Sequence, residues 1–270
     1  MLTQEQAGFF QVNGLRMYVE RAGRGETLLY ISGTGADLRN KPNQLDSPFA
    51  GRFNMVCFDQ RGLGQTQNPE GPYSMADYAD DAAALLDLVG PEPIRVIGVS
   101  FGGMVAQELA IRYPQKIRSL ILACTSSGGT GQPSFPLHEL EALEPLDRIK
   151  RNLQISDTRR TDDWIAENPE QWQKLVEISK AGRRSDRDVE GAMKQLEARK
   201  YHDTFDRLHN LTMPVLLTGG RFDGIAPPDN MRAVAEQLPD AELRLYEGGH
   251  LFFLQDRQAY PDMVDWLLAH

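Results

Sequence analysis

Short apolar runs, bounded by glycine, proline or polar residues, recur along the chain and alternate with amphipathic stretches. The runs typical of buried strands lie at residues 27–31, 54–58, 94–97, 117–122, 214–218 and 242–246. Apolar residues at helical spacing occupy residues 75–89, 104–112 and 260–268. The repeated order of strand, helix and strand predicts an α/β fold with a mostly parallel central sheet and helices on both faces.

The N-terminal pattern differs from the rest of the chain. Two strand-like segments, 9–12 and 15–20, flank Asn13-Gly14, a dipeptide that is favoured in two-residue hairpin turns. We therefore expect an antiparallel hairpin to open the fold, before the first parallel strand.

The strand pattern is interrupted between about Ser126 and Leu208. No run in this segment resembles a buried strand, and glycines and prolines between residues 128 and 136 mark an exit from the sheet. Short amphipathic helices are predicted at residues 137–153, 161–166, 170–180 and 186–201. We expect residues 126–208 to form a helical cap, or lid, on a core domain made of residues 1–125 and 209–270.

The stretch 96–104 combines an apolar strand, a Gly-x-Ser-x-Gly turn centred on Ser100, and the start of a helix. The five-residue motif alone occurs often by chance, but this context is the one that a serine nucleophile requires. Gly98 and Gly102 leave room for a sharp turn that exposes the Ser100 hydroxyl above the sheet. The positive end of the helix dipole points to the same place. The pattern predicts a catalytic serine.

A serine nucleophile needs a base that is itself oriented by a carboxylate. Loops that follow parallel strands share one edge of the sheet, and Asp223 and His250 lie in two such loops. We predict His250 as the base and Asp223 as the acid, although Asp59 and Asp256 are alternatives for the acid. The other histidines follow no core strand in a glycine-rich loop; they are His138, His202, His209 and His270.

A second glycine-flanked loop, Ser32-Gly33-Thr34-Gly35, follows the strand at residues 27–31. Its backbone N–H groups can approach a ligand closely. We expect the N–H groups of Thr34 and Phe101 to form an oxyanion hole. Asp59 and Arg61, in the next such loop, are expected to brace that loop by local hydrogen bonds.

These segments, together with Phe58-Asp59-Gln60-Arg61-Gly62-Leu63-Gly64, resemble α/β-hydrolases of the capped, lipase- and esterase-like superfamily over the whole chain. The similarity is closest to enzymes described as 3-oxoadipate enol-lactonase-like. The sequence departs from the family where members commonly have His-Gly and this chain has Ser32-Gly33. A serine nucleophile argues against the dehalogenase and epoxide-hydrolase branches, which use aspartate. The short oxyanion loop also lacks the glycine-proline form of many carbon-carbon hydrolases.

Composition narrows the classes of partner. The net charge is −9 and the basic residues are scattered, which argues against nucleic acid as a partner. No apolar run approaches 18 residues and the first residues lack a signal-peptide pattern, so we expect a cytoplasmic protein that does not span a membrane. Cys57 and Cys124 are expected to be buried thiols. No metal-ligand spacing is visible, and no cofactor is implied.

The resulting hypothesis is a serine hydrolase that cleaves a small ester or lactone. A carbon-carbon bond hydrolase with the same triad and a weakly catalytic receptor or partner-binding protein are the alternatives; the oligomeric state stays open. Candidate substrate-binding residues are Trp164, Trp172, Met193, Phe205 and Leu251. The basic residues Arg183, Arg184 and Arg187 are expected on a solvated surface rather than in a carboxylate clamp.

Overall fold

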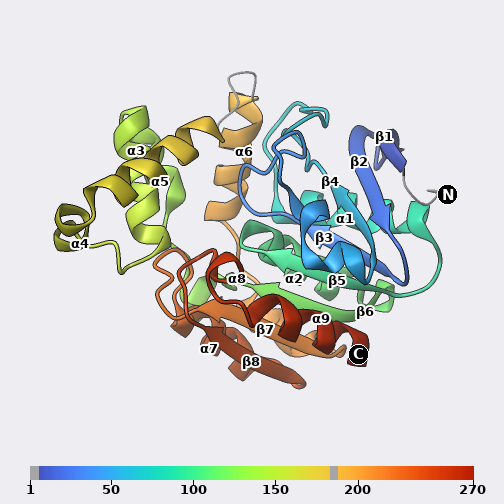
Figure 1. Cartoon of the computed structure of the whole chain (residues 1–270). Helices are drawn as coiled ribbons and strands as arrows, with labels where there is room; N and C mark the ends of the chain where they lie inside the picture. Colours follow the sequence, from blue (N-terminus) through green and yellow to red (C-terminus); the bar gives the residue numbers. More distant parts are fainter. Residues whose placement is uncertain (1–5, 183–187) are drawn as a thin grey trace.

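The computed structural model describes residues 6–182 and 188–270 (Figure 1). In this part of the chain, one eight-stranded sheet has the order β1-β2-β4-β3-β5-β6-β7-β8. The hairpin strands β1 and β2 are antiparallel to each other, and β2 is antiparallel to β4. All pairs from β4 to β8 are parallel, which confirms the predicted mostly parallel sheet. The strands are β1 (Gln6–Val12), β2 (Leu15–Gly23), β3 (Thr27–Ile31), β4 (Asn54–Phe58), β5 (Ile94–Val99), β6 (Ile117–Ala123), β7 (Val215–Gly220) and β8 (Ala241–Tyr246).

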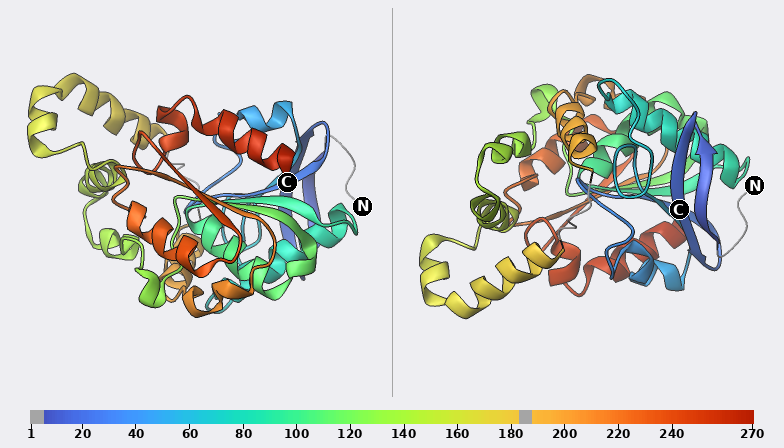
Figure 2. Two further views of the ribbon diagram at one scale, coloured as in Figure 1. Left: turned by 90° about the horizontal axis from the view of Figure 1, so that it is seen from below. Right: turned by 90° about the horizontal axis from the view of Figure 1, so that it is seen from above.

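Helices cover both faces of the sheet (Figure 2). On one face lie α1 (Met75–Val89), α2 (Phe101–Arg112) and α7 (Pro228–Gln237), and on the other lies α9 (Ala259–Ala269). Strand β3 shows why its apolar run is continuous: Leu29 and Ile31 join the first hydrophobic core, whereas Leu28 and Tyr30 join the second. A strand whose successive side chains enter two cores needs apolar residues at every position.

The segment between β6 and β7 is helical. In its described residues no strand joins the sheet, and one isolated bridge pairs Gly128 with Asp203. Its helices are η4 (Gly129–Gly131), η5 (Leu137–Ala142), α3 (Pro145–Ser156), α4 (Asp162–Glu167), α5 (Pro169–Ala181), α6 (Val189–Lys200) and η6 (Phe205–Asn210). Figure 1 shows α3, α4 and α5 grouped beyond one end of the sheet, with α6 between them and the core. We refer to residues 126–208 as the cap segment.

One helix prediction is wrong in detail. The single helix expected over residues 137–153 is divided into η5 and α3, because Pro145 has no N–H to continue a helix and instead begins one. In α7, Pro228 takes the first helical position. The remaining short helices are η1 (Gln44–Asp46), η2 (Pro48–Gly51), η3 (Pro114–Lys116) and α8 (Phe252–Gln255).

Helix α6 of the cap segment lies in close contact with the core. Gly191 lies so near Gly62 that a Cβ atom on Gly191 would be 1.9 Å from the Gly62 carbonyl oxygen. Asn68 donates a hydrogen bond of 2.9 Å to Asp188, which caps α6. Lys194 donates to the Pro69 carbonyl oxygen at 2.9 Å. These contacts fix one face of α6 against the loops that follow β4.

Cys57 and Cys124 are buried free thiols, as expected, and burial raises the pKa of both. Across residues 6–182 and 188–270, none of the helices combines the length and the apolar character needed to cross a membrane.

Candidate active site

Ser100 lies at the junction of β5 and α2, in a turn that requires glycine two residues before it and two residues after it. Its backbone has φ 56° and ψ −117°, an unusual conformation for a residue with a side chain. A Cβ atom on Gly98 would lie 2.4 Å from the Gly102 carbonyl oxygen, and one on Gly102 would lie 2.0 Å from that of Ile31. The two glycines therefore let strand and helix approach closely enough to form this sharp turn.

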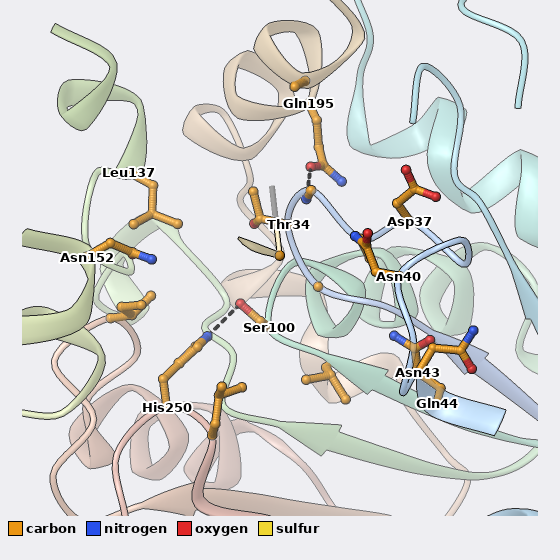
Figure 3. Close-up of a pocket in the computed structure, with 18 of the residues that line it drawn as sticks. Thr34, Asp37, Asn40, Asn43, Gln44, Ser100, Leu137, Asn152, Gln195 and His250 are labelled. Atoms are coloured by element: carbon orange, nitrogen blue, oxygen red, sulfur yellow. Dashed lines mark hydrogen bonds between the residues drawn. The ribbon is translucent and has the colours of Figure 1, made fainter. Parts of the chain in front are cut away.

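Ser100, His250 and Asp223 form a continuous chain of contacts. The Ser100 Oγ lies 2.9 Å from His250 Nε2, and His250 Nδ1 lies 2.7 Å from Asp223 Oδ2 (Figure 3 shows the first of these contacts). A carboxylate can only accept hydrogen bonds, so Nδ1 carries the hydrogen and Nε2 is left to accept one from the Ser100 hydroxyl. All three side chains belong to buried residues. The structure thus brings together the three residues that were predicted from separate loops.

The Asp223 carboxylate is fixed by its own loop. Its Oδ1 accepts hydrogen bonds from the N–H groups of Ile225 at 2.7 Å and Ala226 at 3.0 Å, which leaves Oδ2 for the histidine. The adjoining strands β7 and β8 bring the two loops side by side. A Cβ atom on Gly220 would lie 2.1 Å from the Gly249 carbonyl oxygen, so the close approach of these loops depends on glycine.

The two alternative acids, Asp59 and Asp256, accept hydrogen bonds from other loops. Asp59 accepts hydrogen bonds from the N–H groups of Leu38 at 2.8 Å and Gln65 at 2.9 Å, which confirms its predicted bracing role. Burial raises the pKa of Asp59 to about 6. Asp256 accepts from the N–H groups of Glu247 and Gln258. Neither carboxylate is hydrogen-bonded to His250, so the geometry favours Asp223.

Near Ser100, the N–H groups of Thr34 and of Phe101, the first residue of α2, have no acceptor among the described residues. The loop that carries Thr34 passes close to the serine, because a Cβ atom on Gly33 would lie 3.4 Å from the Ser100 Cβ. The base of this loop is braced by Gln60, whose Nε2 donates to the Ser32 carbonyl oxygen at 2.8 Å. This contact supports the loop at the position where the family commonly has His-Gly.

A cavity of about 710 Å³ opens above Ser100 and His250. Polar residues of the segment 37–44 lie on one side of Ser100, and the cap residues Leu137 and Asn152 lie on the other (Figure 3). The apolar lining includes Leu140, Val189, Met193, Leu196, Ile225, Leu251 and Leu254. No group of three or more His, Cys, Asp or Glu residues in the described ranges is arranged to hold a metal ion.

Only some of the residues predicted to bind substrate line the cavity. Met193 and Leu251 line the cavity, whereas Trp164, Trp172 and Phe205 do not. Both tryptophans pack with Ile149 in a small hydrophobic core of the cap segment. Phe205 packs against the main core. For these three residues the prediction is corrected, because their apolar faces are used to hold helices together. Arg183, Arg184 and Arg187 lie outside the described residues.

Sequence reasoning missed the polar wall of the cavity, formed by Asp37, Asn40, Asn43 and Gln44. These residues belong to a long connection after β3 with no helical or strand periodicity, so no pattern distinguished them from an ordinary surface loop. It also missed Gln195, a buried residue of α6 that contacts the Thr34 loop.

A family model for the alpha/beta hydrolase fold matches residues 26–257. The chain belongs to this family. Among curated relatives, it is 29% identical over 241 residues to a poly(3-hydroxyalkanoate) depolymerase of Ectopseudomonas oleovorans, covering 88% of this chain and 82% of the relative. It is 27% identical over 240 residues to 3-oxoadipate enol-lactonase 2 of Acinetobacter baylyi, covering 88% and 86%.

The fold is also that of a solved enol-lactonase from Burkholderia xenovorans LB400. The TM-score is 0.77 at 21% identity, covering 97% of this α/β-hydrolase and 100% of the enol-lactonase. At this identity the likeness shows the fold alone. Family and relatives together support a hydrolase as the coarse function of the chain.

Proposed function

We propose that this α/β-hydrolase cleaves a small carboxylic ester or lactone through an acyl-enzyme formed on Ser100. The observation that carries the proposal is the chain of contacts from Ser100 Oγ through His250 to Asp223, at 2.9 and 2.7 Å. Both distances are within the reach that general-base activation of a serine requires.

In the first half-reaction, His250 Nε2 accepts the Ser100 proton as Oγ attacks the carbonyl carbon of the substrate. Asp223 stabilises the imidazolium that forms. The N–H groups of Thr34 and Phe101 donate to the oxyanion of the tetrahedral intermediate. When the intermediate collapses, the carbon–oxygen bond to the alcohol breaks and His250 returns the proton to that oxygen. With a lactone, the alcohol stays attached to the acyl group.

In the second half-reaction, His250 takes a proton from water, and the hydroxide attacks the acyl carbon. The second tetrahedral intermediate uses the same two donors, and its collapse returns the proton to Ser100 Oγ. The products are the carboxylic acid and a free enzyme in its starting protonation state. No cofactor takes part in any step of this proposal.

The shape of the cavity supports a small substrate. It lies between the core and the cap segment; residues 37–44 make one side polar, and the rest of the lining is largely apolar but includes Glu141, Arg148 and Asn152. Such a site suits a molecule with an apolar acyl part and a polar remainder. The names of two relatives, a lactonase and a poly(3-hydroxyalkanoate) depolymerase, agree with cleavage of an ester bond.

The test is hydrolysis of a panel of short acyl esters and lactones by the parent protein and by Ser100→Ala, His250→Ala and Asp223→Asn. We expect turnover by the parent and a large loss in each variant, with circular dichroism spectra that match the parent. Full activity in folded Ser100→Ala would overturn the mechanism. Turnover of a diketone without ester cleavage would indicate a carbon-carbon hydrolase. Thermal stabilisation by a panel compound without turnover would indicate a binding protein.

A further inference from the structure

The cap segment reaches the loop of the oxyanion donor through one side chain. Gln195 of α6 is fully buried, and its Oε1 accepts a hydrogen bond of 2.8 Å from the backbone N–H of Gly35 (Figure 3). Gly35 directly follows Thr34, whose N–H is a proposed donor to the oxyanion. The two bonded residues are 160 positions apart in the chain. This contact therefore joins the cap segment to the oxyanion loop, defined here as residues 32–35.

Within residues 6–182 and 188–270, few other hydrogen bonds hold the tip of the oxyanion loop. Gln60 braces the loop at Ser32, and the bond from the Ala36 N–H to the Gly33 carbonyl oxygen is long, at 3.4 Å. Gly35 has φ 70° and open space where a Cβ atom would be, so no neighbour packs on that side of its backbone. The orientation of the Thr34–Gly35 peptide therefore depends on the bond to Gln195.

Fixing this peptide also restrains the donor next to it. The Gly35 N–H lies in the peptide plane after Thr34, and the Thr34 N–H lies in the plane before it. The two planes share one Cα atom and can move relative to each other by only two rotations. Holding the second plane therefore narrows the directions in which the Thr34 N–H can point. A preorganised direction is what makes an oxyanion donor effective.

Other contacts of α6 hold the helix without touching the oxyanion loop. Lys194, the neighbour of Gln195, donates to the Pro69 carbonyl oxygen at 2.9 Å and to Asn68 Oδ1 at 3.2 Å. The Gln195 Nε2 has no hydrogen-bond partner among the described residues, so the amide is held at Oε1 alone. Lys194 therefore helps to hold α6 on the core, whereas its neighbour Gln195 supports the oxyanion loop.

We propose that Gln195 is a positioning residue that holds the oxyanion loop in its working conformation and makes oxyanion stabilisation depend on the docked cap helix. This inference rests on the proposed function, because it assigns a role within the same site. It adds a contribution of the cap segment to the chemical step, beyond enclosure of the substrate.

The test compares Gln195→Met with Lys194→Met, two substitutions of similar shape at adjacent positions of α6. For Gln195→Met we expect kcat to fall about 10- to 100-fold, because a misplaced oxyanion donor lowers the chemical step more than binding. KM should stay within about threefold of the parent value. KM here reflects contacts that are equally strong in the bound substrate and in the transition state. Lys194→Met should retain kcat within about twofold while losing a similar amount of thermal stability. Equal kcat losses in the two variants would overturn the proposal.

A second measurement uses butylboronic acid, which forms a tetrahedral adduct with a reactive serine and places an oxygen in the oxyanion hole. Its affinity should weaken in Gln195→Met by the same factor as kcat/KM, and should be unchanged in Lys194→Met. If the parent hydrolyses nothing on the panel, the proposed function fails, yet boronate binding measured by calorimetry still tests this inference. Parent-like boronate affinity in folded Gln195→Met would overturn it.

Discussion

The backbone N–H of His250 donates a hydrogen bond of 2.6 Å to the carbonyl oxygen of Ser156, the last residue of α3. The preceding carbonyl oxygen, of Ile155, accepts from the N–H of Gly224, next to Asp223, at 2.9 Å. Carbonyl groups at the end of a helix have no hydrogen-bond partner within the helix. Without these two N–H donors, they would need water or a capping group. The end of α3 therefore ties together the loops of the proposed base and acid.

The first prediction uses Gly249→Ala to test the contact between the end of α3 and the His250 loop. A Cβ atom on Gly249 would lie 2.1 Å from the Ser156 carbonyl oxygen, so the loop must move away from α3 and carry His250 with it. We expect a loss of about 1–3 kcal/mol in the free energy of unfolding. We also expect a fall in kcat of about 10-fold or more, because catalysis is sensitive to misplacement by fractions of an ångström. Urea unfolding and ester kinetics measure the two effects.

The control for this variant is Gly51→Ala, at a position with open space around the added carbon. Stability and kcat should stay near those of the parent there. Parent-like kcat in Gly249→Ala would mean that the contact with α3 does not position His250.

The second prediction concerns Asp223→Asn. The two N–H groups that bond Oδ1 would hold the amide oxygen of the asparagine at that place. The amide NH₂ would then face His250 Nδ1, which must accept, so Nε2 would carry the hydrogen and could not take the Ser100 proton. We expect kcat to fall by about 10⁴-fold with little change in fold, as loss of the correct tautomer does in serine proteases. Asp256→Asn, at the rejected alternative, should retain activity; a larger loss there would contradict the assignment.

The third prediction follows from Asp59. Burial raises its pKa to about 6 from an ordinary 3.8, so between these pH values the folded protein binds a proton that the unfolded chain has released. Stability must then fall as pH rises from about 4 to 6, by about 3 kcal/mol for this group, and stay level above that range.

Urea unfolding of the parent and of Asp59→Asn across this range checks the sign. The stability of the parent relative to Asp59→Asn should decrease between pH 4 and pH 6. A difference that increases with pH would show that the hydrogen bonds from Leu38 and Gln65 outweigh burial.

Much of the core could be predicted because its constraints are periodic. A strand such as β3 must be apolar at every position, since alternate side chains enter two hydrophobic cores. Ser100, Asp223 and His250 could be placed together because each follows a parallel strand, and those strands end at one edge. The sequence favoured Asp223 as the acid but left Asp59 open, because both aspartates follow a strand end; the contacts of each carboxylate were needed to decide between them.

The cap segment was harder to predict for a physical reason. An amphipathic helix shows that one face is covered, but the pattern does not say whether another helix, the core or a substrate covers it. Trp172 of α5 is buried against Ile149, whereas Met193 of α6 faces the cavity. Gln195 was missed for a related reason: a polar residue on a helix predicts a solvated face, and only the fold buries it on Gly35.

The last prediction uses this division of the cap residues. Met193 lines the cavity, so Met193→Ala should enlarge the space for the acyl chain and raise kcat/KM for longer acyl esters relative to acetate esters. One additional buried methylene group contributes about 0.8 kcal/mol, so we expect the ratio of hexanoate to acetate turnover to rise at least about threefold. Trp164→Ala, in the small core of the cap segment, should lower the melting temperature and leave this ratio unchanged. The assignment of the apolar wall would be wrong if the ratio changed in Trp164→Ala and not in Met193→Ala.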